Sequence, residues 1–370
     1  MTAARTIAVV GLVVAACVCE VDDGTHARAR VATNATGESA PAPAVVASAP
    51  APAPTRPVAV AAEPAAAEPA PLAAEFVALP RRAAAPEGLV LDDAGAEPRR
   101  VVAWRARKGQ REQVQLSLGL EVALALGTRV VPSTTIPALT VSLLCEVVST
   151  GREASALALS VTDVQVPSVD GAVATPRVQQ ALTRVADELR TTSGTLELGA
   201  DGRLGRLELS SSADGGAREL APERGGLVAA LQELLPVMPR APIGVGARWT
   251  VTQTVRREGA TLQQTREHHL TALDEHGATV SITTRHVAIT DDAAAATVAL
   301  DRATPMIIEA ASGAGTATLV LRDDHVLPHA ATADVDGVTR AQVQIAGAPE
   351  SIAMRTRLHA ALRADDSPAP

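Results

Sequence analysis

The histidines of this sequence are the first residues to test for metal chemistry. His325 and His329 have the four-residue spacing of two ligands on one helix face, but Pro328 places them at a hairpin. Glu267-His268-His269 lies in a predicted strand, where successive side chains point to opposite faces, so its two histidines are badly placed to share one ion. The histidines therefore predict no metal centre.

The carboxylates give no stronger signal. Asp334 and Asp336, followed by Gly337, begin like a calcium-binding loop, but the later ligands are missing and we expect a turn instead. Asp163 and His286 form a titratable pair at similar positions of two predicted strands, and we expect both to be solvated polar residues. The sequence thus predicts no metal and no other cofactor.

Motifs for a nucleophile or a phosphate are missing from the sequence as well. It contains no Gly-x-Ser-x-Gly elbow, and the residue three before its only lysine, Lys108, is Arg105 rather than the serine of a Ser-x-x-Lys pair. Lys108 is followed by Gly109, where a phosphate-binding loop has Ser or Thr. We therefore predict that the protein is not an enzyme.

The one residue with a predicted chemical role is Cys17. A basic start at Arg5 and an apolar run up to Ala16 have the layout of a secretory signal, and acidic residues from Glu20 onward end the run before the roughly 20 residues of a membrane span. The run Val14-Ala15-Ala16-Cys17 resembles the bacterial lipobox. This resemblance implies that residues 1–16 are a signal peptide and that Cys17 is joined to diacylglycerol. An ordinary cleaved signal with a coincidental cysteine is the alternative.

Composition limits both the core and the partners. The net charge of −8 argues against nucleic acid or an anionic membrane surface as a partner, because both select basic patches. With two Trp, one Phe and no Tyr, the core must be built from small aliphatic residues, which suits a large sheet. Three cysteines do not make a disulfide scaffold, and Cys145 is predicted to be a small buried hydrophobe.

The chain divides into a linker, one domain and a tail. Residues 17–97 are rich in Ala and Pro without periodicity, which predicts a disordered linker between the lipidated cysteine and the domain. Residues 98–364 are predicted to be a β-rich domain, and residues 365–370 a polar tail.

Alternation of apolar residues predicts long strands in this domain. In residues 139–149 the apolar residues Val141, Leu143, Cys145 and Val147 share one face. Residues 154–166 alternate in the same way, but the phase slips at Thr162-Asp163, which predicts a β-bulge. Shorter strands are predicted at residues 101–107, 330–335 and 340–345.

Two helices interrupt the strands. One is predicted to begin at Thr175-Pro176 and to end near Leu189, and the other covers Leu220 to Met238. The fold class is therefore mainly β (α+β). We expect a large curved antiparallel sheet, or half-barrel, of about twelve strands with two helices.

The domain also has a candidate internal duplication, of residues 101–216 and residues 245–345. Each half starts at a tryptophan, Trp104 or Trp249, and continues through strands to a Ser-Gly strand with a return strand. In this alignment the bulge at Thr162-Asp163 falls where Arg285-His286 falls in the second half. Chance similarity between periodic β sequences is the alternative.

A short motif connects the domain to a known type of protein. Leu235-Pro236, Pro242-Ile-Gly-Val-Gly246 and Trp249, together with the Ser-Gly strand at Ser312 and the Leu327-Pro328 turn, resemble a family of uncharacterised bacterial lipoproteins with a domain of unknown function. The resemblance covers roughly residues 99–362 and implies a curved half-barrel similar to lipoprotein carriers, which hold acyl chains. It implies no catalytic residues.

Together these observations predict a lipid-anchored cell-envelope protein without enzymatic activity. The expected partners are the membrane, through N-terminal acyl chains, and an apolar ligand such as a lipid, or an envelope protein. A structural or assembly component that docks to an outer-membrane complex is the alternative. Because Val18, not Asp, follows Cys17, the resemblance to sorted lipoproteins favours the outer membrane, facing the periplasm.

Overall fold

A computed structural model describes residues 81–82, 87–127, 129–167, 176–211, 218–219, 230–257, 260–289, 297–299, 305–345 and 348–365. Within these residues 15 strands form one sheet. A path of 13 strands is antiparallel throughout and is not closed into a barrel. The predicted fold class, mainly β with one large curved sheet, is confirmed. Cys17 and most of the predicted linker lie outside the described residues.

The architecture consists of long strands, a few short ones and one long helix. In chain order they are β1 (Arg81–Arg82), β2 (Gly88–Asp93), β3 (Arg111–Leu126), β4 (Arg129–Thr150), β5 (Ala154–Gln165), α3 (Pro176–Arg190), β6 (Thr192–Gly199), β7 (Leu204–Ser211), β8 (Arg218–Glu219), β9 (Arg248–Arg257), β10 (Ala260–Leu273), β11 (Gly277–Ile289), β12 (Thr297–Ala299), β13 (Pro305–Arg322), β14 (Ala330–Ile345) and β15 (Ala348–Ala364). A short helical segment also covers residues 230–234.

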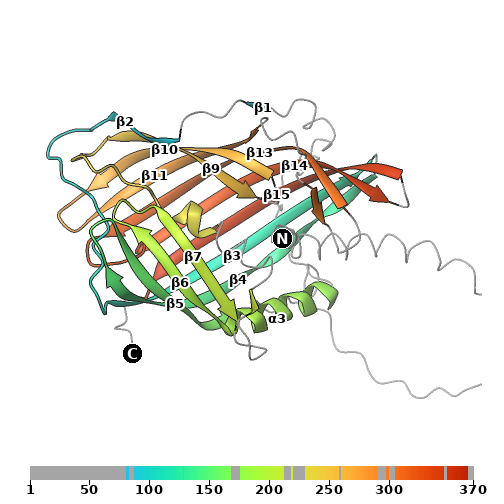
Figure 1. Cartoon of the computed structure of the whole chain (residues 1–370), viewed down its shortest axis with the longest axis horizontal. Helices are drawn as coiled ribbons and strands as arrows, with labels where there is room; N and C mark the ends of the chain where they lie inside the picture. The colour runs from blue at the N-terminus through green and yellow to red at the C-terminus, as the bar shows by residue number, and fades with distance from the viewer. Residues whose placement is uncertain are drawn as a thin grey trace, which may run out of the picture.

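The sheet joins two runs of consecutive strands. Its order is β2-β9-β10-β11-β13-β14-β15-β3-β4-β5-β6-β7-β8, so β15 at the end of the chain pairs with β3 near its start. That pairing runs from Ile352 opposite Leu126 to Ala364 opposite Val114. Figure 1 shows the sheet curling around the helical segment 230–234. The pairing of β2 with β9 also shows that strand structure begins inside residues 17–97, where a linker was predicted.

The two halves do not start alike. Trp249 lies in β9, but Trp104 lies in an irregular segment, so the strand predicted at residues 101–107 is wrong. The Trp104 amide donates to the Ala200 carbonyl at 3.3 Å, so this segment crosses the end of the sheet instead of extending it. The internal duplication stays a prediction.

The register slip predicted at Thr162-Asp163 is present. Ser142 pairs with Asp163 and Leu143 with Val161, so Thr162 is the extra residue of a bulge in β5. At Arg285-His286, which the candidate duplication aligns with this bulge, the register with β10 is unbroken. The two aligned sites therefore differ in structure.

The helices are confirmed in part. Helix α3 covers the first predicted helix, and its buried residues Leu182 and Leu189 lie on the predicted apolar face. The second predicted helix ends at residue 234 rather than at Met238. Pro236 explains the early end, because a proline disfavours helical backbone at the residue before it.

Strand β14 is one strand where two were predicted. The expected turn at Asp334–Gly337 is wrong, since these residues pair continuously with both β13 and β15. The carboxylate of Asp336 is held by Arg355 of β15, with 2.6 Å between Nη2 and Oδ2. A cross-strand ion pair therefore replaces the turn chemistry that Asp and Gly favour.

Candidate functional site

The inner face of the sheet carries a layer of polar side chains between two apolar regions. Along β10, for example, Leu262 and Leu270 are buried at the ends and polar residues occupy the inward positions between them. We call this layer the polar belt; its members are Gln253, Gln264, Arg266, His268, Thr284 and His286 from the sheet and Glu233 from the helical segment 230–234. Buried polar groups this numerous need matched partners to be stable.

The apolar regions on either side are separate clusters. The first core surrounds Trp249 and includes Leu234, Leu270, Val280 and Leu319. The second core lies toward the other ends of the long strands and includes Leu124, Leu182, Val343, Ile352 and Met354. Leu182 belongs to α3, so that helix covers part of the second core.

Glu233 sits at the centre of the polar belt. Its side chain is 1% exposed, and its carboxylate accepts from Gln264 Nε2 at 2.9 Å and from Thr284 Oγ1 at 3.3 Å. The His286 Nε2 atom lies 3.5 Å from the same carboxylate. A buried carboxylate with these neighbours is held by hydrogen bonds from two strands.

Gln264 sets the direction of the hydrogen bonds. Its Oε1 accepts from Gln253 Nε2 at 2.6 Å, which leaves its amide nitrogen to donate both to Glu233 and, at 2.9 Å, to His286 Nε2. Because an amide nitrogen only donates, His286 Nε2 is the acceptor of this hydrogen bond.

Arg266 closes the end of the helical segment. Its guanidinium donates to the carbonyls of Gln232 (2.9 Å), Glu233 (2.9 Å) and Leu235 (2.8 Å), while the side chain is buried. The last carbonyls of a helix have no partner within it and carry partial negative charge, so a buried cation is stabilised there. The polar belt therefore ties residues 230–235 to β10.

His268 stacks on Trp249 at the border with the first core. The ring centroids are 5.0 Å apart, and His268 Nδ1 donates to the Arg266 carbonyl at 3.1 Å. Its buried Nε2 has no hydrogen-bond partner among the described residues. Burial, and next the neighbouring Arg266 charge, lower the pKa of His268 well below its usual value.

Glycines on β13 make room for the polar belt. A Cβ on Gly313 would lie 3.4 Å from His286 Nδ1 and 2.9 Å from the Asp336 carbonyl. A Cβ on Gly315 would lie 2.9 Å from a methyl group of Val335. Any larger residue at these positions would push against strand β14 or His286.

The chemistry available here is hydrogen bonding and charge neutralisation. The Thr284 hydroxyl donates to Glu233 rather than to His286. Thr284 and His286 therefore do not form a pair of nucleophile and base. The arrangement holds its own polar groups in place, which is the property of a structural or binding layer.

The structure separates most of the residues that the sequence singled out. His286 is buried in the polar belt, so the expectation that it is solvated is wrong, whereas Asp163 is exposed as expected. His268 and His269 point to opposite faces of β10, which confirms that prediction. Cys145 is buried as predicted, and burial, with a smaller contribution from Glu112, raises the pKa of its thiol.

The two histidines with ligand spacing belong to a turn. His325 Nδ1 lies 2.7 Å from Glu112 Oε1, and the His325 and His329 rings meet edge to face at 5.1 Å. Glu112 Oε2 also accepts from the amides of Val326 and Leu327. Within the described residues, no group of three or more His, Cys, Asp or Glu could hold a metal ion.

The residues that carry the family resemblance have structural roles. Trp249 Nε1 donates to the Val237 carbonyl at 2.7 Å, which anchors the proline segment after the helical residues 230–234. A Cβ on Gly244 would lie only 1.7 Å from the Ala96 carbonyl oxygen, so this position requires glycine. These motif residues thus allow separate backbone segments to cross at close range.

Sequence reasoning missed Glu233, Gln264 and Arg266. A usable signal was present, since Gln264 and Arg266 share the parity of Leu262 and therefore face inward. Nothing in the sequence pairs that strand with Glu233, whose position depends on the crossing of residues 235–249.

Comparison with known proteins gives little. No protein-family model matches the chain, and no curated protein matches it. One similar solved structure is an outer membrane channel from Pseudomonas putida F1, with 8% sequence identity over 70% of this chain and 97% of that chain. The TM-score is 0.20, too low to support an argument. Among the described residues, no helix has the length and apolar character needed to cross a membrane.

Proposed function

We propose that the protein is a lipid-anchored component of the cell envelope whose curved sheet binds an apolar ligand without catalysing a reaction. The anchor would be Cys17, within the run Val14-Ala15-Ala16-Cys17. The observation that carries the binding proposal is the order of the inner face, where the polar belt separates a first core built around Trp249 from a second core.

The second core is the better place for such a ligand. It is lined by small and aliphatic residues of the long strands, such as Ala311, Ala341 and Ile352. The first core is filled by Trp249 and by the buried segment 234–238. The polar belt also favours binding over catalysis, because Glu233, Gln264 and Thr284 are engaged with one another.

A fluorescent fatty acid tests the ligand proposal. Ala341→Leu should weaken probe binding to the full chain by at least about tenfold, because it adds volume to the second core. Ala333→Leu is the matched control, since it adds the same volume to the first core. Equal effects of the two substitutions, or no probe binding by the wild type, would contradict the proposal.

Intact mass and membrane fractionation test the anchor. Wild-type protein should carry acyl mass and sediment with membranes. Cys17→Ala should lose the acyl mass, since it removes the thiol of the residue that follows Val14-Ala15-Ala16. An unacylated wild type, cleaved and released, would show that the protein is secreted instead.

A further inference from the structure

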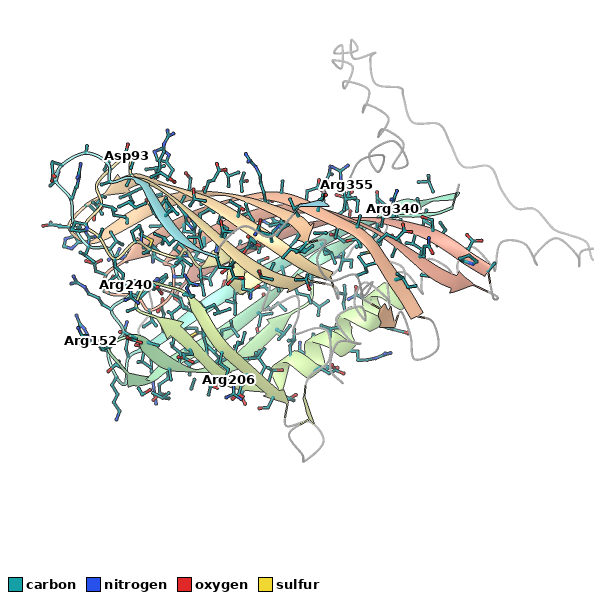
Figure 2. All side chains as sticks on the ribbon, turned by 45° about the horizontal axis from the view of Figure 1, so that its top comes forward. Asp93, Arg152, Arg206, Arg240, Arg340 and Arg355 are labelled. Carbon is teal, nitrogen blue, oxygen red and sulfur yellow. The ribbon has the colours of Figure 1, made fainter. Side chains whose placement is uncertain are left out.

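One end of the molecule gathers exposed cations from three separate segments. Arg105, Arg107 and Lys108 come from the irregular segment before β3, Arg152 from the β4–β5 turn and Arg240 from the segment before β9. All five are exposed, and none forms an ion pair within the described residues. We call this region the basic end. Figure 2 shows Arg152 and Arg240 projecting from one end of the sheet, and Arg340 and Arg355 from another part of it.

Backbone hydrogen bonds hold these segments together. The Trp104 amide donates to the Ala200 carbonyl at 3.3 Å, and the Ala200 amide donates to the Glu153 carbonyl at 2.8 Å. Gly109 donates to the Val147 carbonyl at 2.8 Å, and Met238 to the Asp201 carbonyl at 2.7 Å. The cations are therefore displayed on a braced surface and not on independent loops.

Acidic groups at this end are mostly engaged. Glu146 pairs with Arg111, Asp323 with Arg100 and Asp324 with Arg322. Asp201 accepts from the Arg203 amide, and Glu153 is exposed beside Arg152. Three of these carboxylates are thus paired with arginines, whereas the five cations of the basic end form no ion pair within the described residues.

Exposed apolar side chains accompany the cations. Val101, Val148 and Val245 are 41%, 42% and 45% exposed. Arg100 and Ile243 form a β-bridge, which brings the neighbouring Val101 and Val245 close together. Val148 lies next to Val147, whose carbonyl accepts from the Gly109 amide. Exposed arginines together with exposed aliphatic groups form the surface that anionic lipid bilayers attract, through phosphate contacts and shallow apolar insertion.

We propose that the basic end docks on an anionic lipid surface. The site is independent of the proposed ligand site, and it would restrain the orientation of the sheet relative to the lipid surface. Each arginine near an anionic surface contributes about fivefold to affinity. The negative charge of the chain does not oppose this contact, because the contact depends on local charge within about 10 Å.

Hydrogen exchange of the full chain on lipid vesicles tests this proposal. Amides of residues 101–110 and 148–153 should exchange more slowly on vesicles of equal parts phosphatidylcholine and phosphatidylglycerol than on phosphatidylcholine alone. The variant Arg105→Gln, Arg107→Gln, Arg152→Gln, Arg240→Gln should lose that protection. The readout is local, so it does not depend on whether Cys17 is acylated.

A matched control removes the same charge elsewhere. The variant Arg184→Gln, Arg285→Gln, Arg340→Gln, Arg357→Gln should keep the protection of residues 101–110. Equal protection on both vesicles, equal loss in both variants, or protection by soluble polyglutamate but not by phosphatidylglycerol would overturn the proposal. The last result would assign the basic end to an acidic protein.

Discussion

The inner and outer faces of the same long strands carry charge in two different ways. On the inner face, Glu233 and Arg266 are buried and their partners are fixed groups of the fold. On the outer face, Glu121, Arg357 and Asp336 form a ladder across β3, β15 and β14, with 3.4 Å from Arg357 Nη1 to Glu121 Oε2 and 3.3 Å from Arg357 Nε to Asp336 Oδ2.

The difference shows what burial does to similar chemistry. Arg355 of β15 also pairs with Asp336 and joins this outer ladder. The four side chains are 28% to 54% exposed, so water screens them and their contribution to stability is small. Buried groups of the inner face have no water to replace a lost hydrogen-bond partner, so each lost partner lowers the free energy of unfolding more.

The largest effect is expected from Arg266→Leu. It leaves three buried helix-end carbonyls without their charged donor, which should lower the free energy of unfolding by about 3–5 kcal/mol. Urea unfolding measures this. Arg266→Lys keeps the charge but not the forked geometry, so its free energy of unfolding should lie between those of the wild type and Arg266→Leu. A loss below about 1 kcal/mol would mean that the polar belt behaves like the outer ladder.

Gln264→Leu should come next. It removes the donor that Glu233 and His286 share and the acceptor of Gln253, for an expected loss of about 2–3 kcal/mol. Gln253→Leu, measured in the same urea titration, removes a single donor and should cost less. Equal losses would show that the direction of hydrogen bonding set by Gln264 is unimportant.

The pH dependence of stability sharpens the comparison at His268. Because its pKa is lowered in the folded state, the unfolded chain binds a proton below about pH 6.5 that the folded chain does not. Stability should therefore fall as the pH drops below about 6.5, by up to about 1.4 kcal/mol per pH unit. His268→Gln should flatten this slope, and His269→Gln, on the opposite face, should not. Parallel curves for wild type and His268→Gln would count against the buried neutral ring.

The smallest effect is expected from the outer ladder. Arg355→Gln should lower the free energy of unfolding by less than about 1 kcal/mol, and less again at high salt. Burial by itself raises the pKa of Asp336, but hydrogen bonds from Arg355 and Arg357 lower it further, so the net pKa is below its usual value. The stability from this group is lost as the pH falls through that pKa. If Arg355→Gln lowers the free energy of unfolding by more than about 2 kcal/mol at every salt concentration, the charges of the two faces contribute similarly to stability.

Local patterns determined most of the sheet. Alternation in residues 139–149 and 154–166 was enough to place β4, β5 and the bulge at Thr162, because a buried face selects apolar residues at every second position. Helix α3 followed in the same way from its capping proline and apolar face. The class of the fold could be predicted because each of these signals is contained in one element.

Local patterns failed where distant partners decide. The local sequence Asp336-Gly337 predicts a turn, but Arg355 of the neighbouring strand binds Asp336 within β14. The burial of His286 depends on Glu233, which is 53 residues away in sequence (286 − 233) and arrives through the crossing of residues 235–249. The basic end likewise collects cations from three segments of an acidic chain.

By itself, then, the sequence determined the aliphatic composition of the core, the faces of the strands and the candidate lipid attachment at Cys17, because these depend on neighbouring residues along the chain. Only the tertiary structure decided that β15 pairs with β3, that a polar belt separates two cores and that arginines without an ion pair in the described part of the chain meet at one end. Hydrogen bonds and charges act over a few ångströms in space, and the residues that share them here are separated by tens to hundreds of residues along the chain.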